Sequence, residues 1–311
     1  MKLPARPPRE HDYLSLADHF ATVTFTDAEG HARRVRTRYK REGSGSPMLL
    51  VHGLMTTSYS WRFVLRALAE RYDVIAPDLV GAGETDGPPD MVYSTHNVAR
   101  FIRAFAEQLT GEPVYLVGNS LGGLYSLASV LLPGGRAWAR RFVLMHAPGY
   151  PSARTKALHA LLGAPLLGGA LGGLVSRVSH ATRRTFVAKN VHYHAPEMMS
   201  EEEVDQYARI FESLEGARVF TRILRESLVP SEHAALIAQA RAATDLPPTL
   251  LLFAREDVMV PPAFGPMFER DLAGSRLVWF DDASHFLQVD APERTVREIF
   301  DFDRESATLS T

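Results

Sequence analysis

The sequence predicts an α/β protein with a mostly parallel, doubly wound sheet and a helical cap inserted between late strands. Three observations lead to this prediction. Short, continuously apolar runs recur along the chain, helical patterns separate them, and residues 147–229 contain no clear strand pattern. Continuously apolar runs are typical of strands buried on both faces of a parallel sheet. Their alternation with helices is typical of a doubly wound fold, whose functional loops lie at the carboxyl ends of the strands.

The expected strands are of two kinds. Residues 20–25 and 33–39 alternate apolar and polar side chains, with a turn at Glu29 and Gly30 between them, which indicates half-buried strands. Fully buried strands are expected at 48–51, 74–76, 114–117, 142–145, 249–253 and 277–280. Residues 94–109 place apolar side chains along one stripe before Gly111, and this pattern predicts a helix.

The composition restricts the kind of partner. The 311 residues include 34 basic and 36 acidic ones, which leaves a formal charge of -2. A protein that grips nucleic acid over a broad surface needs an excess of positive charge, so we expect no nucleic-acid partner. The chain has no cysteine, which excludes a disulfide framework, a cysteine-ligated zinc site and a thiol nucleophile.

Two segments bear on location. The first ten residues are basic and rich in proline, but no apolar run follows them, so we expect no secretory signal. Residues 157–175 form the most apolar stretch, yet they contain a histidine, a proline and five glycines. Such interruptions are unlike a membrane-spanning helix. We therefore expect a cytoplasmic protein without stable membrane insertion.

The insertion between late strands divides the chain into two predicted parts. Residues 1–146 and 230–311 are expected to form the α/β core, and residues 147–229 the helical cap. Charge is segregated within this cap. Residues 147–196 contain six basic residues and no acid, whereas residues 197–226 contain eight acids against four arginines.

The cap sequence also predicts a helix start and a set of apolar contacts. Ser200 and Glu203 have the spacing of a capping box, and an apolar face follows them. Other apolar side chains of the cap either line a substrate pocket or simply dock the cap on the core. These candidates are Leu158, Leu161, Leu162, Leu166, Leu167 and Phe186.

The strongest chemical motif is Gly118-Asn119-Ser120-Leu121-Gly122, which follows a buried strand and runs into a helical pattern. This is the context of a G-x-S-x-G nucleophile elbow. A sharp strand-to-helix turn strains its central serine, and glycines two positions on either side let the backbones pass. The start of the helix directs its dipole at a developing oxyanion. Ser120 is therefore the candidate nucleophile.

A serine nucleophile needs a base and an orienting carboxylate. His285 follows the last expected strand, where its loop can return the imidazole over the sheet, and it is the preferred base. His146, at the end of another strand, is the alternative. Asp257 follows the strand at 249–253 and is the preferred acid, with its neighbour Glu256 as the alternative. The chain order of serine, acid and histidine differs from both protease orders.

Together these motifs resemble the α/β-hydrolase family, specifically its capped lineage of esterases, carbon–carbon bond hydrolases, perhydrolases, epoxide hydrolases and haloalkane dehalogenases. The resemblance extends from about residue 20 to residue 304. Its markers are Val51-His52-Gly53-Leu54, Pro77-Asp78-Leu79-Val80-Gly81-Ala82-Gly83, the Ser120 elbow, Asp257, and His285 followed by Asp290-Ala291-Pro292-Glu293.

The resemblance implies an oxyanion hole made by the backbone N–H groups of Leu54 and Leu121. Haloalkane dehalogenases and epoxide hydrolases carry an aspartate at the elbow, so Ser120 disfavours those two activities. We expect a serine hydrolase for small apolar carboxylic esters that needs no metal and no organic cofactor. One alternative is hydrolysis of activated carbon–carbon bonds by the same triad, and another is a non-catalytic ligand receptor. The oligomeric state stays open.

Overall fold

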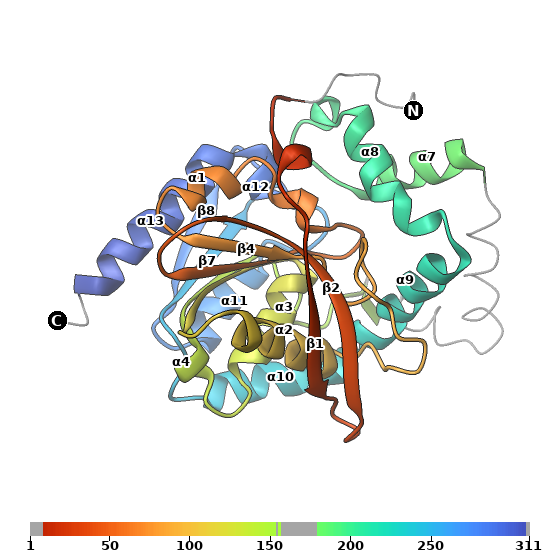
Figure 1. Ribbon diagram of the computed structural model, residues 1–311. Coiled ribbons are helices and arrows are strands. Elements are labelled where there is room, and N and C mark those ends of the chain that lie inside the picture. The colour runs from red at the N-terminus through yellow and green to blue at the C-terminus, as the bar shows by residue number, and fades with distance from the viewer. Residues whose placement is uncertain (1–8, 154, 157–178, 309–311) are drawn as a thin grey trace.

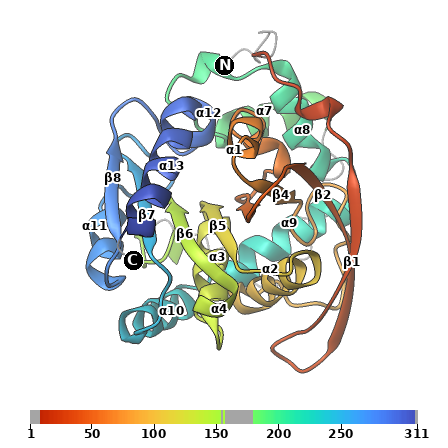
Figure 2. The ribbon, with the colours of Figure 1, turned by 60° about the vertical axis from the view of Figure 1, so that its left-hand side comes forward.

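One eight-stranded sheet forms the centre of the molecule (Figures 1 and 2). The computed structural model describes residues 9–153, 155–156 and 179–308. The strands are β1 (His19–Thr26), β2 (Ala32–Gly43), β3 (Pro47–Val51), β4 (Asp73–Pro77), β5 (Val114–Asn119), β6 (Ala139–Met145), β7 (Thr249–Ala254) and β8 (Arg276–Phe280). Their order across the sheet is β1-β2-β4-β3-β5-β6-β7-β8. Every expected strand is therefore confirmed, and the fold is the predicted α/β class.

The sheet is mostly parallel, as expected. Strand β2 pairs antiparallel with both β1 and β4, and all the remaining pairs are parallel. Parallel pairing brings the carboxyl ends of β3, β5, β6 and β7 to the same edge. The residues that follow these strands include the motifs around His52, Ser120, His146 and Asp257. The fold thus collects the predicted site residues at one edge of the sheet.

The core helices cover both faces of the sheet. They are α1 (Leu65–Ala69), α2 (Thr95–Leu109), α3 (Leu121–Val130), α4 (Gly135–Trp138), α10 (Pro230–Ala242), α11 (Phe264–Asp271), α12 (Leu287–Asp290) and α13 (Pro292–Thr308), with the 3₁₀ turns η1 (Tyr13–Ser15) and η2 (Ser58–Trp61). Figure 2 shows α1, α12 and α13 on one face and α2, α3 and α10 on the other. The predicted helix at 94–109 is α2, which begins after the N-cap Ser94.

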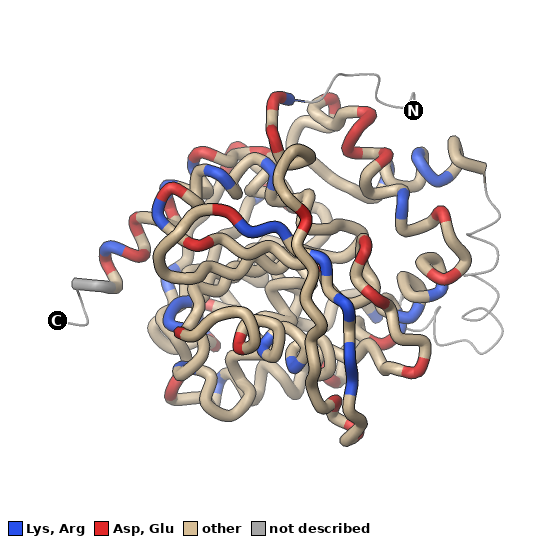
Figure 3. Tube along the Cα trace, in the orientation of Figure 1, with Lys and Arg blue, Asp and Glu red and all other residues tan. Residues whose placement is uncertain are grey.

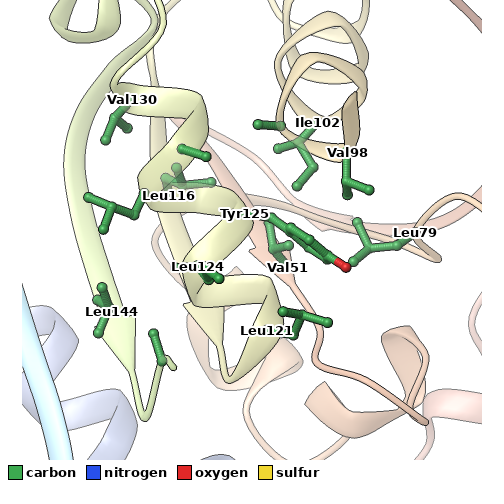
Figure 4. Close-up of a cluster of buried hydrophobic side chains, with 14 of the residues drawn as sticks. Val51, Leu79, Val98, Ile102, Leu116, Leu121, Leu124, Tyr125, Val130 and Leu144 are labelled. Atoms are coloured by element: carbon green, nitrogen blue, oxygen red, sulfur yellow. The ribbon is translucent and has the colours of Figure 1, made fainter. Parts of the chain in front are cut away.

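Two buried apolar clusters lie on the two faces of the sheet, because neighbouring strand residues point in opposite directions. On strand β3, Leu49 and Val51 belong to one cluster, whereas Met48 and Leu50 belong to the other. The first cluster includes the side chains of α2 and α3. Figure 4 shows Leu121, Leu124 and Tyr125 of α3 close to strand residues on one side and to α2 on the other. Helix α3, which begins directly after Ser120, is thereby fixed on both sides.

Strand β2 is longer than its alternating pattern predicted. The pattern ends near Tyr39, but the strand continues to Gly43 because residues 39–43 pair with β4. Lys40 interrupts the apolar pattern and is nevertheless buried. Its ammonium donates to the Leu16 carbonyl oxygen over 2.5 Å and pairs with Asp18 at 2.8 Å, which satisfies the charge.

Residues 147–229, between β6 and α10, contain helices and no strand where the structure describes them. They include α7 (His180–Asn190), η3 (Pro196–Met198), α8 (Glu201–Ala208), η4 (Arg209–Phe211) and α9 (Leu214–Ser227), which follow one another along one side of the molecule (Figure 1). The predicted capping box of Ser200 and Glu203 is present at the start of α8. Leu158, Leu161, Leu162, Leu166 and Leu167 lie outside the described residues.

Charges from the two halves of this segment meet between α7 and α8. Figure 3 shows basic residues on α7 beside acidic residues on α8. Arg184 of α7 lies 3.1 Å from Asp205 and 3.8 Å from Glu201, both on α8. The segregated charges therefore pair with each other, at least in part. In the described part of the chain, no helix has the length and apolar character needed to cross a membrane.

Candidate active site

The turn from β5 into α3 holds Ser120 in a strained backbone conformation, with φ of 56° and ψ of -127°. The flanking glycines are required by close backbone contacts. A Cβ atom on Gly118 would lie 2.7 Å from the Cα atom of Gly123, and one on Gly122 would lie 2.3 Å from the His52 carbonyl oxygen. The Ser120 N–H donates to the Met145 carbonyl oxygen over 2.8 Å. The strain at Ser120 is therefore sustained by packing and hydrogen bonds around it.

His285 connects this serine to a carboxylate. Its Nε2 lies 2.8 Å from Ser120 Oγ, and its Nδ1 lies 2.8 Å from Asp257 Oδ2. Glu256, the alternative acid, instead lies 3.1 Å from His194 Nδ1. The structure thus brings Ser120, His285 and Asp257 into one line of hydrogen bonds and places Glu256 away from it.

Asp257 is held as a carboxylate by donors on both of its oxygens. Oδ1 accepts the N–H groups of Met259 and Val260 over 2.6 and 3.0 Å. Oδ2 faces His285 and also His146, whose Nδ1 lies 2.7 Å away. Burial acts to raise the pKa of Asp257, but the two histidines outweigh it and hold that pKa well below its ordinary range.

His146, the alternative base, contacts the acid and not the serine. Its ring is fully buried, and its Nε2 accepts the backbone N–H of Ala254 over 3.1 Å. That acceptor role leaves the proton of the neutral ring on Nδ1, which faces Asp257. Burial lowers the pKa of His146 against the opposing effect of Asp257. Among the described residues, His146, Asp257 and His285 are close enough to hold a metal ion, but the hydrogen bond of His285 to Asp257 and the ion-pair contact of His146 with the same oxygen account for their spacing.

The loop after β3 is braced by His52. Its Nδ1 donates to the Gly53 carbonyl oxygen over 2.8 Å, while its Nε2 accepts the Leu79 N–H over 2.9 Å. Burial lowers the pKa of His52 and keeps the ring neutral. Within the described residues, the N–H groups of Leu54 and Leu121 donate to no other group of the chain. Both residues and Ser120 line the same cavity, so the two donors are available there.

The cavity beside Ser120 and His285 has a volume of about 530 Å³. Its walls come from the carboxyl ends of the strands and from helices α7 and α9 with the turn η4. Its lining includes leucine and methionine side chains and five aromatic ones, namely Phe186, Phe211, Phe220, Phe264 and Phe286. Phe186, expected either to line the pocket or to dock the cap on the core, is among the lining residues and is 42% exposed. Arg183 lines the same cavity and donates to the Phe211 carbonyl oxygen over 2.8 Å.

Two residues near the site were not predicted. Asn119, inside the elbow motif, donates its side-chain N–H to the His285 carbonyl oxygen over 3.2 Å. Asp290 accepts the N–H of Ser284 over 2.9 Å and the N–H of His194 over 3.1 Å. The position of Asn119 beside Ser120 was the available signal for the first, and the Asp290-Ala291-Pro292-Glu293 marker for the second. Neither signal revealed which loop the side chain would hold.

Comparison with curated proteins finds several hydrolases. The chain is 26% identical to the uncharacterized hydrolase YugF of Bacillus subtilis over 82% of this chain and 89% of that protein. It is 27% identical to haloalkane dehalogenase 2 of Mycobacterium tuberculosis, over 86% of this chain and 91% of that protein. It is also 36% identical to the 2-hydroxy-6-oxo-2,4-heptadienoate hydrolase of Pseudomonas putida, over 42% of this chain and 47% of that protein.

Solved structures share the fold. A thermophilic esterase from Thermogutta terrifontis matches with a TM-score of 0.72 and 22% identity, over 92% of this chain and 98% of that chain. A variant of the meta-cleavage product hydrolase CumD matches with a TM-score of 0.71 and 25% identity, over 91% of this chain and 97% of that chain. The family model described as alpha/beta hydrolase fold matches residues 46–292, most of the chain. The chain therefore belongs to the α/β-hydrolase fold family and is a hydrolase of that fold.

Proposed function

We propose that the protein is a serine hydrolase that cleaves carboxylic esters through an acyl-enzyme on Ser120. The observation that carries this proposal is the relay in which His285 lies 2.8 Å from Ser120 Oγ and 2.8 Å from Asp257 Oδ2. A serine hydroxyl is a weak nucleophile unless a base is in contact with it and oriented by a third group. The relay supplies both requirements.

The reaction follows from this geometry. His285 takes the proton of Ser120 as Oγ bonds to the ester carbonyl carbon, and the N–H groups of Leu54 and Leu121 bind the resulting oxyanion. Collapse of this intermediate breaks the bond to the alcohol oxygen, which receives the proton from His285. Water then attacks the acyl-enzyme with His285 again as base, which releases the acid and restores Ser120. Asp257 stays ionised and orients His285 throughout.

The cavity favours substrates with apolar groups around the ester. Its volume of about 530 Å³ suits a small molecule, and its aromatic wall offers apolar contact. We assign residues 147–229 the role of a cap, because α7, η4 and α9 supply side chains to this wall. The pairing of Arg184 with Asp205 and Glu201 leaves less free positive charge for an anionic lipid surface, which favours a pocket for monomeric esters.

A second candidate is hydrolysis of an activated carbon–carbon bond by the same residues. Two observations favour it. One relative is named for a heptadienoate, which is a carboxylate, and Arg183 provides a cation in the wall of the cavity. A 2-hydroxy-6-oxo-2,4-dienoate is the discriminating substrate. If it is cleaved with a higher kcat/KM than any ester, and if R183L lowers that value by about tenfold or more through loss of a charged hydrogen bond, the carbon–carbon assignment replaces ours.

The direct test uses p-nitrophenyl esters of increasing acyl length with the wild type and Ser120→Ala. We expect turnover by the wild type and a loss of at least about ten-thousand-fold in the variant, with unchanged thermal stability. An organophosphonate should label Ser120. Ser152→Ala is the matched control, because Ser152 lines the same cavity. Ligand binding without turnover would support a receptor and contradict the proposal.

The pocket assignment has its own measurement. With a short-chain ester, the rate should follow a smooth hyperbola as the substrate concentration crosses its solubility limit. A sharp rise when an emulsion forms, abolished when Arg183 and Arg184 are neutralised together, would instead identify an enzyme that acts at lipid surfaces.

A further inference from the structure

One oxygen of Asp257 serves two histidines. Oδ2 lies 2.8 Å from Nδ1 of His285 and 2.7 Å from Nδ1 of His146. The two rings come from different strand ends, and their centroids are 5.7 Å apart. Only His285 reaches Ser120. The proposed reaction uses His285 and Asp257 and assigns no task to His146, although its ring is fully buried beside them.

The surroundings of His146 fix its ring and its tautomer. The Ala254 N–H donates to Nε2 over 3.1 Å, so Nε2 carries no proton and Nδ1 does. The backbone N–H of His146 donates to the Leu252 carbonyl oxygen over 3.2 Å. The Phe253 ring lies 5.3 Å from the imidazole, measured between the ring centroids. The backbone at His146 has a φ of 46°, which most side chains disfavour. This strained position brings the ring Nδ1 to 2.7 Å from Asp257 Oδ2, although Nδ1 makes no hydrogen bond with a described group.

We propose that His146 is a positioning residue that fixes the Asp257 carboxylate and limits how strongly its Oδ2 supports a protonated His285. His146 Nδ1 makes no hydrogen bond with a described group, but it lies 2.7 Å from Oδ2, and the positive end of its N–H dipole partly offsets the negative charge that Oδ2 presents to His285. Without His146, Oδ2 would interact with His285 alone, and the imidazolium would be more stable. The carboxylate would also lose one of the groups that orient it. The inference rests on the proposed function, because it concerns the same relay.

Other groups close to this relay also titrate or carry charge. Ser120 and Asp257 contact His285 directly, and Arg183 lines the same cavity. Asp290 acts on the loop of His285 through the N–H of Ser284. Glu256 and His194 pair with each other beside Asp257. Of these groups, Asp290 is the one that requires a control, because burial raises its pKa to about 6.

The experiment compares three substitutions of His146. His146→Asn keeps an N–H donor near the position of Nδ1 and tolerates a positive φ. His146→Leu keeps apolar volume but no donor, and His146→Gly tolerates the positive φ and has no side-chain donor. Circular dichroism and thermal melting establish which variants fold, and phosphonate titration normalises the rates to active sites. Asp290→Asn serves as the control for a second titrating group.

Two readouts separate positioning from simple packing. For the Leu or Gly variant, we expect kcat to fall by about tenfold and the midpoint of the pH profile of kcat/KM to rise by about half a unit or more. For the Asn variant, we expect both values to stay close to those of the wild type. A folded Leu or Gly variant with unchanged kcat and unchanged midpoint would overturn the proposal, as would an Asn variant impaired as much as Leu.

A titration of the His285 imidazole by nuclear magnetic resonance gives the same information without turnover. Its midpoint should rise in the Leu or Gly variant and stay unchanged in the Asn and Asp290→Asn variants. If the wild type hydrolyses no ester, the proposed function fails, and this titration still decides the role of His146. An unmoved midpoint in every folded variant would overturn it.

Discussion

Asn119 donates its side-chain N–H to the backbone carbonyl oxygen of His285 over 3.2 Å. This bond joins the residue before the nucleophile to the loop that carries the base. Because Asn119 lies at the buried end of β5, it fixes the His285 backbone relative to Ser120. The short distance between the imidazole and the hydroxyl therefore depends on a bond that neither group makes itself.

Replacing Asn119 should impair catalysis more than folding. In Asn119→Ala, the His285 carbonyl oxygen loses its partner, and the loop gains freedom to move the imidazole away from Ser120. We expect kcat to fall by about 10- to 100-fold, because small displacements of reacting groups have large effects on rate. Stability should fall by about 1–3 kcal/mol. The measurements are kcat with a p-nitrophenyl ester and denaturant unfolding. An unchanged kcat in the folded variant would show that the loop holds its position without this bond.

The two adjacent acids should differ sharply when each is neutralised. Asp257→Asn presents an amide to His285 and disturbs the tautomer that the base requires, so we expect kcat to fall by about ten-thousand-fold at neutral pH. Glu256→Gln is the matched control, and it breaks only the pair with His194. Its kcat should stay within about threefold of the wild type, as for other exposed charges. Equal losses in both variants would mean that the two carboxylates share the role of the acid.

The hydrogen bonds of His285 with Ser120 and Asp257 also predict the direction in which activity changes with pH. His285 accepts a proton from Ser120 only when its ring is neutral, so activity should rise with pH through a single histidine titration. The pH profile of kcat/KM measures this. A profile unchanged by His285→Gln but abolished by His146→Gln would reverse the assignment of the base.

Replacing a glycine of the elbow should destabilise the fold. A Cβ atom at position 122 would lie 2.3 Å from the His52 carbonyl oxygen and 2.5 Å from that of Val51. Neither backbone atom can move without shifting β3 or α3, so Gly122→Ala should destabilise the protein by at least about 2 kcal/mol. Gly111→Ala is the matched control, because a Cβ atom there meets nothing within 4 Å. Chemical denaturation measures both, and equal stability of the two variants would contradict the steric account.

The sequence predicted the strands and the elbow because their signals are local. A buried strand shows as an apolar run, and the turn at Ser120 requires Gly118 and Gly122 whatever surrounds it. Strand β2 shows where prediction from local signals fails. Its pairing with β4 beyond Tyr39 depends on a neighbour distant in the chain, and the buried Lys40 conceals the pattern.

In the candidate site, too, the sequence predicts what local signals show but not what depends on distant parts of the chain. Two histidines at loop positions were both candidates for the base, and two adjacent carboxylates were both candidates for the acid. Which histidine faces Ser120 depends on how β6, β7 and the loop after β8 are placed relative to one another. The contact of His146 with Asp257 is a product of that placement. No residue next to His146 in the chain signals it.

Asp290 should make the free energy of unfolding fall as the pH rises from about 4 to about 6. Burial raises its pKa to about 6, against the opposing hydrogen bonds from the N–H groups of Ser284 and His194. The folded protein therefore binds a proton between about pH 4 and pH 6 that the unfolded chain has already released. The stabilising effect of that proton is complete below the unfolded pKa and is lost as the pH rises through the folded one.

Asp290→Asn removes this titration and keeps one oxygen acceptor. Its free energy of unfolding, relative to that of the wild type, should therefore increase from pH 4 to pH 7 by at most about 3 kcal/mol. Urea unfolding at a series of pH values measures the difference. Asp282→Asn removes an exposed charge from the same segment together with its pair with Arg294, and so reports the effect of net charge and of one exposed ion pair. If the Asp290→Asn and wild-type curves run parallel across this range, the Asp290 carboxylate is not held at a raised pKa, and its two N–H partners outweigh its burial.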